Sequence, residues 1–148
     1  MDLMRLDLAT LAYLAGSSAN DAVLARLHEI GHTGVRVSHG FVVQHLIEGA
    51  PTVSELGELL GVTQQAASKQ LLELERLGYV ERAPDPADSR VRRARLTARG
   101  RRLVEDGRRL RRELDVPGNA AAKRALIRLL DATGGTENVL KRRVPPAD

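Results

Sequence analysis

The 148-residue sequence contains no cysteine and no tryptophan, and aromatic side chains make up 2% of it. The lack of cysteine excludes a disulfide framework, a thiolate metal site and a cysteine redox sensor. The scarcity of aromatic side chains argues against a platform on which single-stranded nucleic acid stacks. No apolar run approaches the ~20 residues that a membrane-spanning helix needs. The first residues do not have the pattern of a signal peptide, because acidic side chains lie among them. We therefore expect a soluble, cytoplasmic protein of one domain with an extension.

The charge is unevenly distributed along the chain, although the net charge is only +4. Residues 1–81 carry five basic and ten acidic side chains, a net charge of −5, whereas residues 82–113 carry twelve arginines and five acidic side chains, a net charge of +7. Such a concentration of arginine is expected of a surface that contacts nucleic-acid phosphates. A basic helix that is merely solvated is the alternative for the part beyond Gly100.

Residues 52–78 have the pattern of two short helices joined by a tight turn. Thr52 and Glu55 fit a capping box, Gly61 fits the turn, and Thr63 fits the N-cap of the second helix. Spacings of i, i+4 and i+7 place an apolar stripe on this second helix at Ala67, Leu71 and Leu74. Another face carries Gln64, Gln65, Ser68 and Lys69. A hydrogen-bonding face of this kind suits the DNA major groove, and an ordinary solvated face is the alternative.

A hairpin rich in arginine is predicted directly after this helix. Gly78 fits a left-handed helix end, residues 79–82 and 91–96 fit two strands, and residues 84–89 have turn composition. Because strand side chains alternate, Arg92 and Arg93 should lie on opposite faces, so that only one of them contacts DNA. The sequence thus predicts a mainly α-helical protein with a small β-hairpin wing, a winged helix-turn-helix.

Three segments resemble the MarR family of transcriptional regulators. The wing motif is DPADSR at 85–90 followed by RLTARG at 95–100, and residues 56–63 and 75–82 are also similar to the family. The resemblance implies a homodimer that binds a palindromic operator in double-stranded DNA, usually represses transcription and often releases DNA when a small molecule binds. It also implies that Arg90 enters the minor groove at the wing tip. Asp88 is then expected to pair with Arg90 or brace the turn.

The DNA contacts follow from the polar helix face and the wing. Glutamine pairs bidentately with adenine, so Gln64 and Gln65 are the first candidates for base contacts. Leu72 is unexpected, because it lies near the polar face where related proteins usually carry a polar residue. The complete set predicted to contact DNA is Thr63, Gln64, Gln65, Ser68, Lys69, Arg82, Arg90 and Arg92.

Further helices are predicted on both sides of this region. Residues 2–30 have the pattern of two helices interrupted at Gly16, Ser17 and Ser18, and helices are also expected at 35–48, 97–115 and 120–132. The resemblance implies that 1–34 and 101–133 are dimerisation helices flanking a DNA-binding region at 35–100. Packing of the N-terminal part within its own subunit is the alternative. Residues 134–148 are expected to form a flexible tail.

The four histidines do not have the spacing of a metal site, and no cofactor is expected. They form no i, i+4 pair on a helix, and no cysteine or carboxylate cluster completes a ligand set. By resemblance, a cavity for an effector is expected between the dimerisation and DNA-binding parts. The residues predicted to line it are His39, Val42, His45 and Leu46.

The sequence leaves two functions other than DNA reading to consider, a protein-binding module and an enzyme. A winged-helix module that binds proteins without reading DNA is favoured by Leu72 and by the few basic residues on the polar helix. An enzyme is disfavoured, because no nucleophile–base pair, phosphate-cradling loop or metal set is present. Asp85 and Asp88 resemble an acid–base pair, but turn chemistry explains both.

Overall fold

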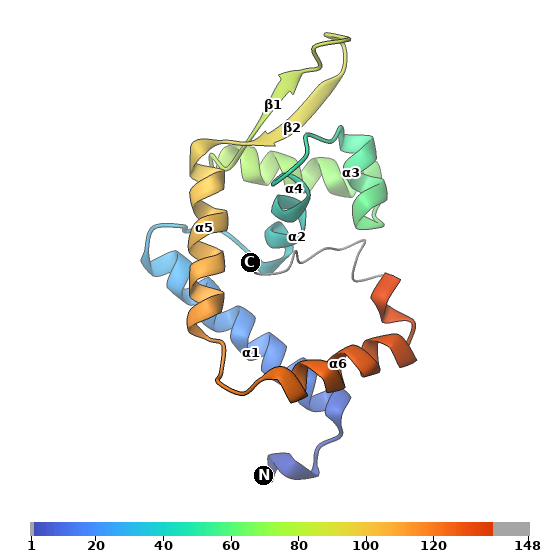
Figure 1. Ribbon diagram of the computed structural model, residues 1–148. Helices are drawn as coiled ribbons and strands as arrows, with labels where there is room; N and C mark the ends of the chain where they lie inside the picture. The colour runs from blue at the N-terminus through green and yellow to red at the C-terminus, as the bar shows by residue number, and fades with distance from the viewer. Residues whose placement is uncertain (1, 138–148) are drawn as a thin grey trace.

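The computed structural model describes residues 2–137, which form helices and one two-stranded hairpin (Figure 1). The hairpin projects at one end, α1 and α6 lie at the other, and α5 runs between the two ends. The mainly α-helical class with a β-hairpin wing is therefore confirmed. The elements are a 3-10 helix Leu3–Arg5, α1 Leu8–Glu29, α2 Val37–His45, α3 Val53–Leu60, α4 Gln64–Arg76, β1 Val80–Pro84, β2 Arg92–Leu96, α5 Ala98–Glu113 and α6 Ala120–Ala132.

The predicted helix boundaries around the turn are confirmed by the caps. The Thr52 hydroxyl accepts from the Glu55 amide at 3.2 Å, and the Glu55 carboxylate accepts from the Thr52 amide at 3.0 Å. Gly61 ends α3 with a φ of 67°, in the left-handed region that favours glycine. The Thr63 hydroxyl then accepts from the Ala66 amide at 3.1 Å and begins α4.

The N-terminal region differs from its prediction, because α1 is one continuous helix from Leu8 to Glu29. The expected break at Gly16, Ser17 and Ser18 is wrong. Glycine costs only about 1 kcal/mol relative to alanine inside a helix, and no proline removes a backbone donor there. Burial of Val23 and Leu27 holds the C-terminal half of this helix against the core. The helix predicted at 35–48 is also shorter than expected, at Val37–His45.

The core lies beneath the helix-turn-helix and the base of the hairpin. The predicted stripe on α4 is confirmed, because Ala67, Leu71 and Leu74 are fully buried, as are Leu56 of α3 and Tyr79 before β1. Burying α4 on this side orients its opposite face outward. The packing thus presents the polar face of α4 to solvent.

The hairpin is antiparallel, with Val80 opposite Leu96 and Pro84 opposite Arg92. It is anchored at its base, because the Ala94 amide donates to the Pro51 carbonyl at 2.9 Å, in the segment that leads into α3. This contact fixes the hairpin beside the helix-turn-helix. The predicted strands are therefore confirmed, with β1 reaching two residues further than expected.

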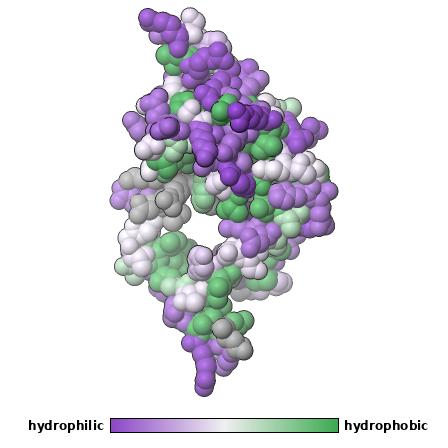
Figure 2. Space-filling model, turned by 180° about the vertical axis from the view of Figure 1, so that it is seen from behind, coloured by the Kyte–Doolittle hydropathy of each residue, from purple (hydrophilic) through white to green (hydrophobic). Residues whose placement is uncertain are grey.

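The end of the molecule away from the hairpin carries exposed apolar side chains, and α1 contacts α6 there. Seen from behind, hydrophilic side chains gather over the hairpin end, and apolar side chains appear towards the opposite end (Figure 2). The exposed apolar residues of these helices include Leu8, Tyr13, Leu14, Leu126, Ile127 and Leu130.

The C-terminal segment was predicted as a tail at 134–148. Residues 135–137 form a helical turn, and residues 138–148 lie outside the described residues. Within 2–137, no helix has the length and apolarity needed to cross a membrane.

Candidate nucleic-acid interface

The outward face of α4 carries the side chains predicted to read bases. Gln64, Gln65 and Lys69 are exposed, and Ser68 is half-buried. No hydrogen bond joins the side chains of Gln64, Gln65 or Lys69 to any other group within residues 2–137. Their donors and acceptors therefore face solvent, at the N-terminal end of a helix whose dipole also favours phosphate.

The wing tip is held by Asp88, as the sequence predicted. The Asp88 carboxylate accepts from Arg90 Nε and Nη2, both at 3.1 Å, and from the Arg90 amide at 3.1 Å. The hydrogen bond from Arg90 lowers the pKa of Asp88, which keeps the carboxylate charged. Asp88 therefore both pairs with Arg90 and braces the turn. The Arg90 side chain is still 88% exposed, so its guanidinium is available to an outside partner.

The two adjacent arginines of β2 point in different directions, as strand alternation predicted. Arg93 pairs with Asp85 and Glu55 and donates to the Ala50 carbonyl at 3.0 Å, so it ties the hairpin to the helices. Arg92 is exposed and donates to the Arg82 carbonyl at 2.9 Å. Arg92 is thus the more exposed arginine of this pair.

A shallow depression joins α4 to the wing on the same side of the molecule. Arg82 crosses it to pair with Glu75 of α4 at 2.5 Å, which holds the wing against this helix. Leu72 is 42% exposed within it. The depression is lined by Ser68, Leu72, Glu75, Arg82 and Arg92. The structure thus brings α4, Arg82 and Arg92 onto one surface, with Arg90 beyond them at the tip.

A buried polar cluster joins this region to α5, and no sequence pattern predicts it. His32, which is 6% exposed, donates through Nε2 to Asp106 at 2.9 Å, and its Nδ1 lies 3.0 Å from the Tyr79 hydroxyl. That hydroxyl also accepts from Arg99 at 3.1 Å, and the Arg99 guanidinium lies over the Tyr79 ring. The cluster links the α1–α2 turn, the base of the wing and α5.

The His32–Asp106 bond predicts an acid dependence of stability. The hydrogen bond from His32 lowers the pKa of Asp106. A carboxyl group with a lowered folded-state pKa stabilises the fold above its unfolded pKa of about 3.9 and loses this effect as pH falls through the folded value. Asp106→Asn is therefore expected to melt below the wild type at pH 7, with the difference in Tm shrinking below about pH 4. Thermal melts from pH 3 to pH 8 measure this.

Asp21→Asn is the control for the Asp106 variant, since Asp21 is exposed on α1. A Tm difference for Asp106→Asn that stays constant across the pH range would contradict the role of the carboxylate charge.

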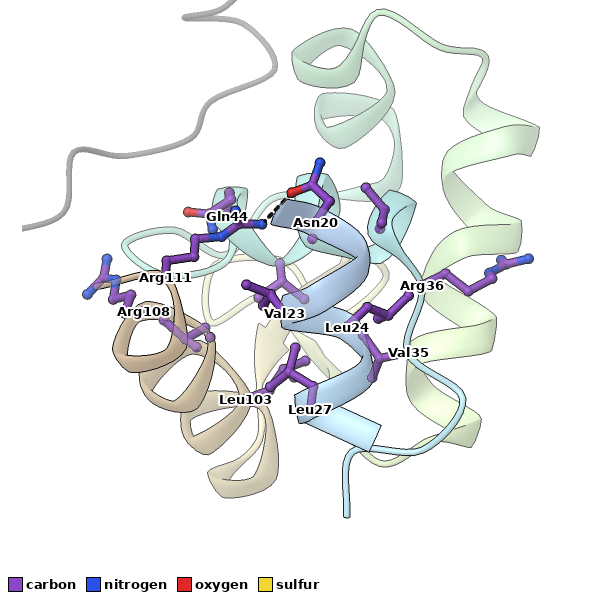
Figure 3. A pocket seen from close by; sticks show the side chains of 15 residues that line it. Asn20, Val23, Leu24, Leu27, Val35, Arg36, Gln44, Leu103, Arg108 and Arg111 are labelled. Atoms are coloured by element: carbon purple, nitrogen blue, oxygen red, sulfur yellow. Dashed lines mark hydrogen bonds between the residues drawn. The ribbon is translucent and has the colours of Figure 1, made fainter. Parts of the chain in front are cut away.

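None of the residues predicted to line an effector cavity, His39, Val42, His45 and Leu46, lines the cavity beside α2. His39, Val42 and Leu46 are 1%, 0% and 3% exposed and face the core. A cavity of about 190 Å³ lies instead on the other side of α2, against α1 and α5 (Figure 3). The sequence of a short helix with apolar residues on two sides does not reveal which side is packed in the core. The lining residues are Asn20, Val23, Leu24, Leu27, Val35, Arg36, Val37, Gly40, Val43, Gln44, Leu103, Val104, Gly107, Arg108 and Arg111.

The polar side chains of this cavity were missed in the sequence. Arg111 donates to Asn20 Oδ1 at 2.9 Å, and the Gln44 Oε1 atom is buried without a hydrogen bond in the described chain. Arg108 also lies at its edge (Figure 3). Within residues 2–137, no three histidine or acidic side chains are grouped as metal ligands.

Comparisons with known proteins agree on one fold. RV1404 from Mycobacterium tuberculosis is 25% identical, with a TM-score of 0.66 over 86% of this chain and 89% of that one. A MarR mutant from E. coli complexed with operator DNA is 23% identical, with a TM-score of 0.64 over 90% of this chain and 99% of that one. CouR from Rhodococcus jostii, bound to p-coumaroyl-CoA, is 23% identical, with a TM-score of 0.64 over 92% and 98%. No curated protein sequence matches the chain.

The family model that matches is that of the MarR family, over residues 33–91. This range includes α2, the helix-turn-helix, β1 and the wing tip, which carry most of the surface described above. Residues 33–91 are therefore similar to the MarR family, and most of the chain shares the fold of the E. coli MarR structure.

Proposed function

We propose that the protein is a homodimeric repressor that binds a palindromic operator and is released by a small molecule. The observation that carries this proposal is the exposed hydrogen-bonding face of α4, which lies on the same side as the arginines of the wing. Half-buried Ser68 lies where α4 meets the wing, because it is a residue of α4 and also lines the depression beside the wing.

Each side chain on this surface has a distinct role in the proposal. Gln64 and Gln65 contact base edges in the major groove, where glutamine recognises adenine. Arg90 enters the minor groove. The remaining residues contact phosphates or hold the helix in register, namely Thr63, Ser68, Lys69, Arg82 and Arg92. The operator complex of the E. coli MarR mutant supports this docking, because that protein shares the fold.

The apolar end of the molecule supports the homodimer. Leu14 of α1 is 44% exposed and Ile127 of α6 is 55% exposed, in helices that contact each other far from the wing. Contiguous exposed apolar surface marks interaction sites. We assign dimerisation to residues 1–34 and 101–133 and DNA binding to residues 35–100. A two-fold axis through this end lets the recognition helices reach half-sites about 34 Å apart.

The cavity supports an effector of defined chemistry, an organic anion with an apolar body. Valine and leucine side chains form most of its wall, and no acidic residue lines it among those described. Arg108 has no hydrogen bond or ion pair within residues 2–137, and Arg111 has only the neutral Asn20 as a partner. Two cations without carboxylate partners thus lie beside an apolar space. CouR, which shares the fold, is bound to p-coumaroyl-CoA.

If the effector is an organic anion, the two arginines should affect the affinity for an acid but not for its neutral amide. Replacing both Arg108 and Arg111 with methionine keeps apolar stems but removes the charges. We expect an aromatic carboxylate to bind about 10- to 100-fold more weakly, since a hydrogen bond to a charged group contributes about 1.5–3 kcal/mol. The corresponding aromatic amide should bind with little change. Calorimetric titration of both compounds measures this.

Arg112→Met is the matched control, because Arg112 is exposed on the same helix and does not line the cavity. If the double variant lost affinity for the acid and the amide equally, the arginines would only pack against the ligand.

Selection from a pool of random double-stranded DNA tests the proposed function as a whole. The retained sequences should converge on an inverted repeat whose half-sites are centred about 10 base pairs apart, as required by two recognition helices on a two-fold axis. Convergence on a single half-site would contradict the homodimer. No convergence would favour the protein-interaction module, for which the exposed Leu72 is the supporting observation.

A further inference from the structure

Helix α2 lies between the cavity and the recognition helix. One side of α2 lines the cavity with Val37, Gly40 and Gln44. The other side is buried in the core through His39 and Val42, which are 1% and 0% exposed. If a molecule in the cavity moves α2, the residues packed against the opposite side of α2 must move as well, since packed cores do not deform gradually.

The opposite side of α2 holds α4 through one carboxylate, that of Glu73. Its Oε2 atom accepts from His39 Nε2 at 3.0 Å and from Arg36 Nη2. The ring of His39 is oriented for this, because its Nδ1 accepts from the Arg36 amide at 3.1 Å. The hydrogen bond from His39, with the charge of Arg36, lowers the pKa of Glu73 and keeps it ionised. Two groups at the start of α2 therefore converge on the recognition helix.

Arg36 belongs to both the cavity and this contact. It lines the cavity, while its guanidinium extends away from the cavity towards α4 and pairs with Glu73 (Figure 3). No other residue that lines the cavity makes a hydrogen bond or ion pair with α4 in the part of the chain described. Displacement of the Arg36 stem by a bound molecule therefore acts directly on the position of α4.

We propose that Arg36 and Glu73 couple the cavity to the recognition helix. They are positioning residues: Arg36 holds α4 through Glu73, and a molecule in the cavity weakens that hold by moving Arg36 and α2. This inference rests on the proposed release of DNA by a ligand and names the contact through which the release occurs. A ligand shifts this equilibrium only by the difference in its affinity for the two positions of α2.

A cavity-filling substitution tests the coupling without any ligand. Gly40 lines the cavity, and a Cβ atom added there meets no atom within 4 Å, so Gly40→Leu extends into the open space. We expect Gly40→Leu to lower affinity for the selected operator roughly 5- to 150-fold, the usual range of coupling between sites. In a Glu73→Gln background, where the charge pair with Arg36 is absent, the same substitution should lower operator affinity by less than about twofold. An equal loss in both backgrounds would overturn the proposal.

Gly40→Ala is the matched control, because it also replaces a helical glycine but adds a single carbon. It should leave operator affinity within about twofold of the wild type, since one methyl group leaves Arg36 in place. Glu73→Gln alone should lower affinity for the operator and leave affinity for scrambled DNA unchanged. A loss on both kinds of DNA would mean that Glu73 supports folding and does not position α4.

Hydrogen exchange of the DNA-free protein separates this inference from the proposed function. Gly40→Leu should raise amide exchange in residues 64–76, and Glu73→Gln should raise it without a further increase in the double variant. Unchanged exchange in α4 of Gly40→Leu, with raised exchange in α2, would overturn the coupling even if the protein binds its operator. Absence of any operator preference in the wild type would instead refute the proposed function.

Discussion

Replacing Gly100 with alanine is expected to lower the free energy of unfolding by about 3 kcal/mol or more, at the upper end of overpacking effects. A Cβ atom at this position would lie 2.2 Å from the Tyr79 carbonyl oxygen. That oxygen cannot withdraw easily, because it accepts from the Thr97 amide at 3.1 Å where β2 passes into α5. The glycine of the wing motif thus allows α5 to approach the backbone at the base of the wing.

Gly107→Ala in the same helix is the control for this substitution. A Cβ atom added at Gly107 meets nothing within 4 Å, so alanine should stabilise the protein by about 0.5–1 kcal/mol through helix propensity alone. Urea unfolding of the two variants measures both effects. A Gly100→Ala protein as stable as the wild type would contradict the close approach described for α5.

Replacing Gln64 or Gln65 with alanine is expected to relax base choice and to leave binding to scrambled DNA nearly unchanged. A bidentate contact to a base contributes about 1–3 kcal/mol of discrimination. Both side chains are exposed and their amide groups face solvent. The variants should therefore lose most of their preference at one position of each half-site, which a panel of single-base operator variants measures.

Arg90→Ala is the contrasting variant, because its side chain is 88% exposed at the wing tip. It should weaken binding to every DNA sequence. The slope of log affinity against log salt concentration should become shallower by about one for each subunit. Equal losses on all sequences for the glutamine variants would refute their assignment as base-reading residues.

Local signals in the sequence were sufficient to predict the helix-turn-helix and the wing. The caps at Thr52, Thr63 and Thr97 and the left-handed Gly61 and Gly78 depend on neighbours within a few residues. The Asp88–Arg90 pair is equally local. Contacts of this range are encoded by spacing, so pattern analysis finds them.

The cavity and the buried polar clusters depend on partners far away in the sequence. His32 binds Asp106 and His39 binds Glu73, contacts that no periodicity indicates. Burial of a histidine beside a charged partner appears only when the chain is folded. Which side of α2 borders a cavity depends on distant partners in the same way.

The error in α1 has a different physical origin. Gly16 and its two serine neighbours are weak helix formers, but each costs only about 1 kcal/mol or less in a helix interior. A long helix that is held by its C-terminal packing tolerates them. The weak helix formers at Gly16, Ser17 and Ser18 therefore do not mark an end of α1.

The most direct test of DNA reading is the binding of the purified protein to labelled DNA from immediately upstream of its own coding sequence, against scrambled DNA, over a salt series. We predict tight binding to the upstream DNA, at least about 1000-fold stronger than to the scrambled sequence, with an affinity that falls steeply as salt rises. Weak and equal binding to both DNAs, repeated with the operator selected from the random pool, would contradict sequence-specific regulation by this surface.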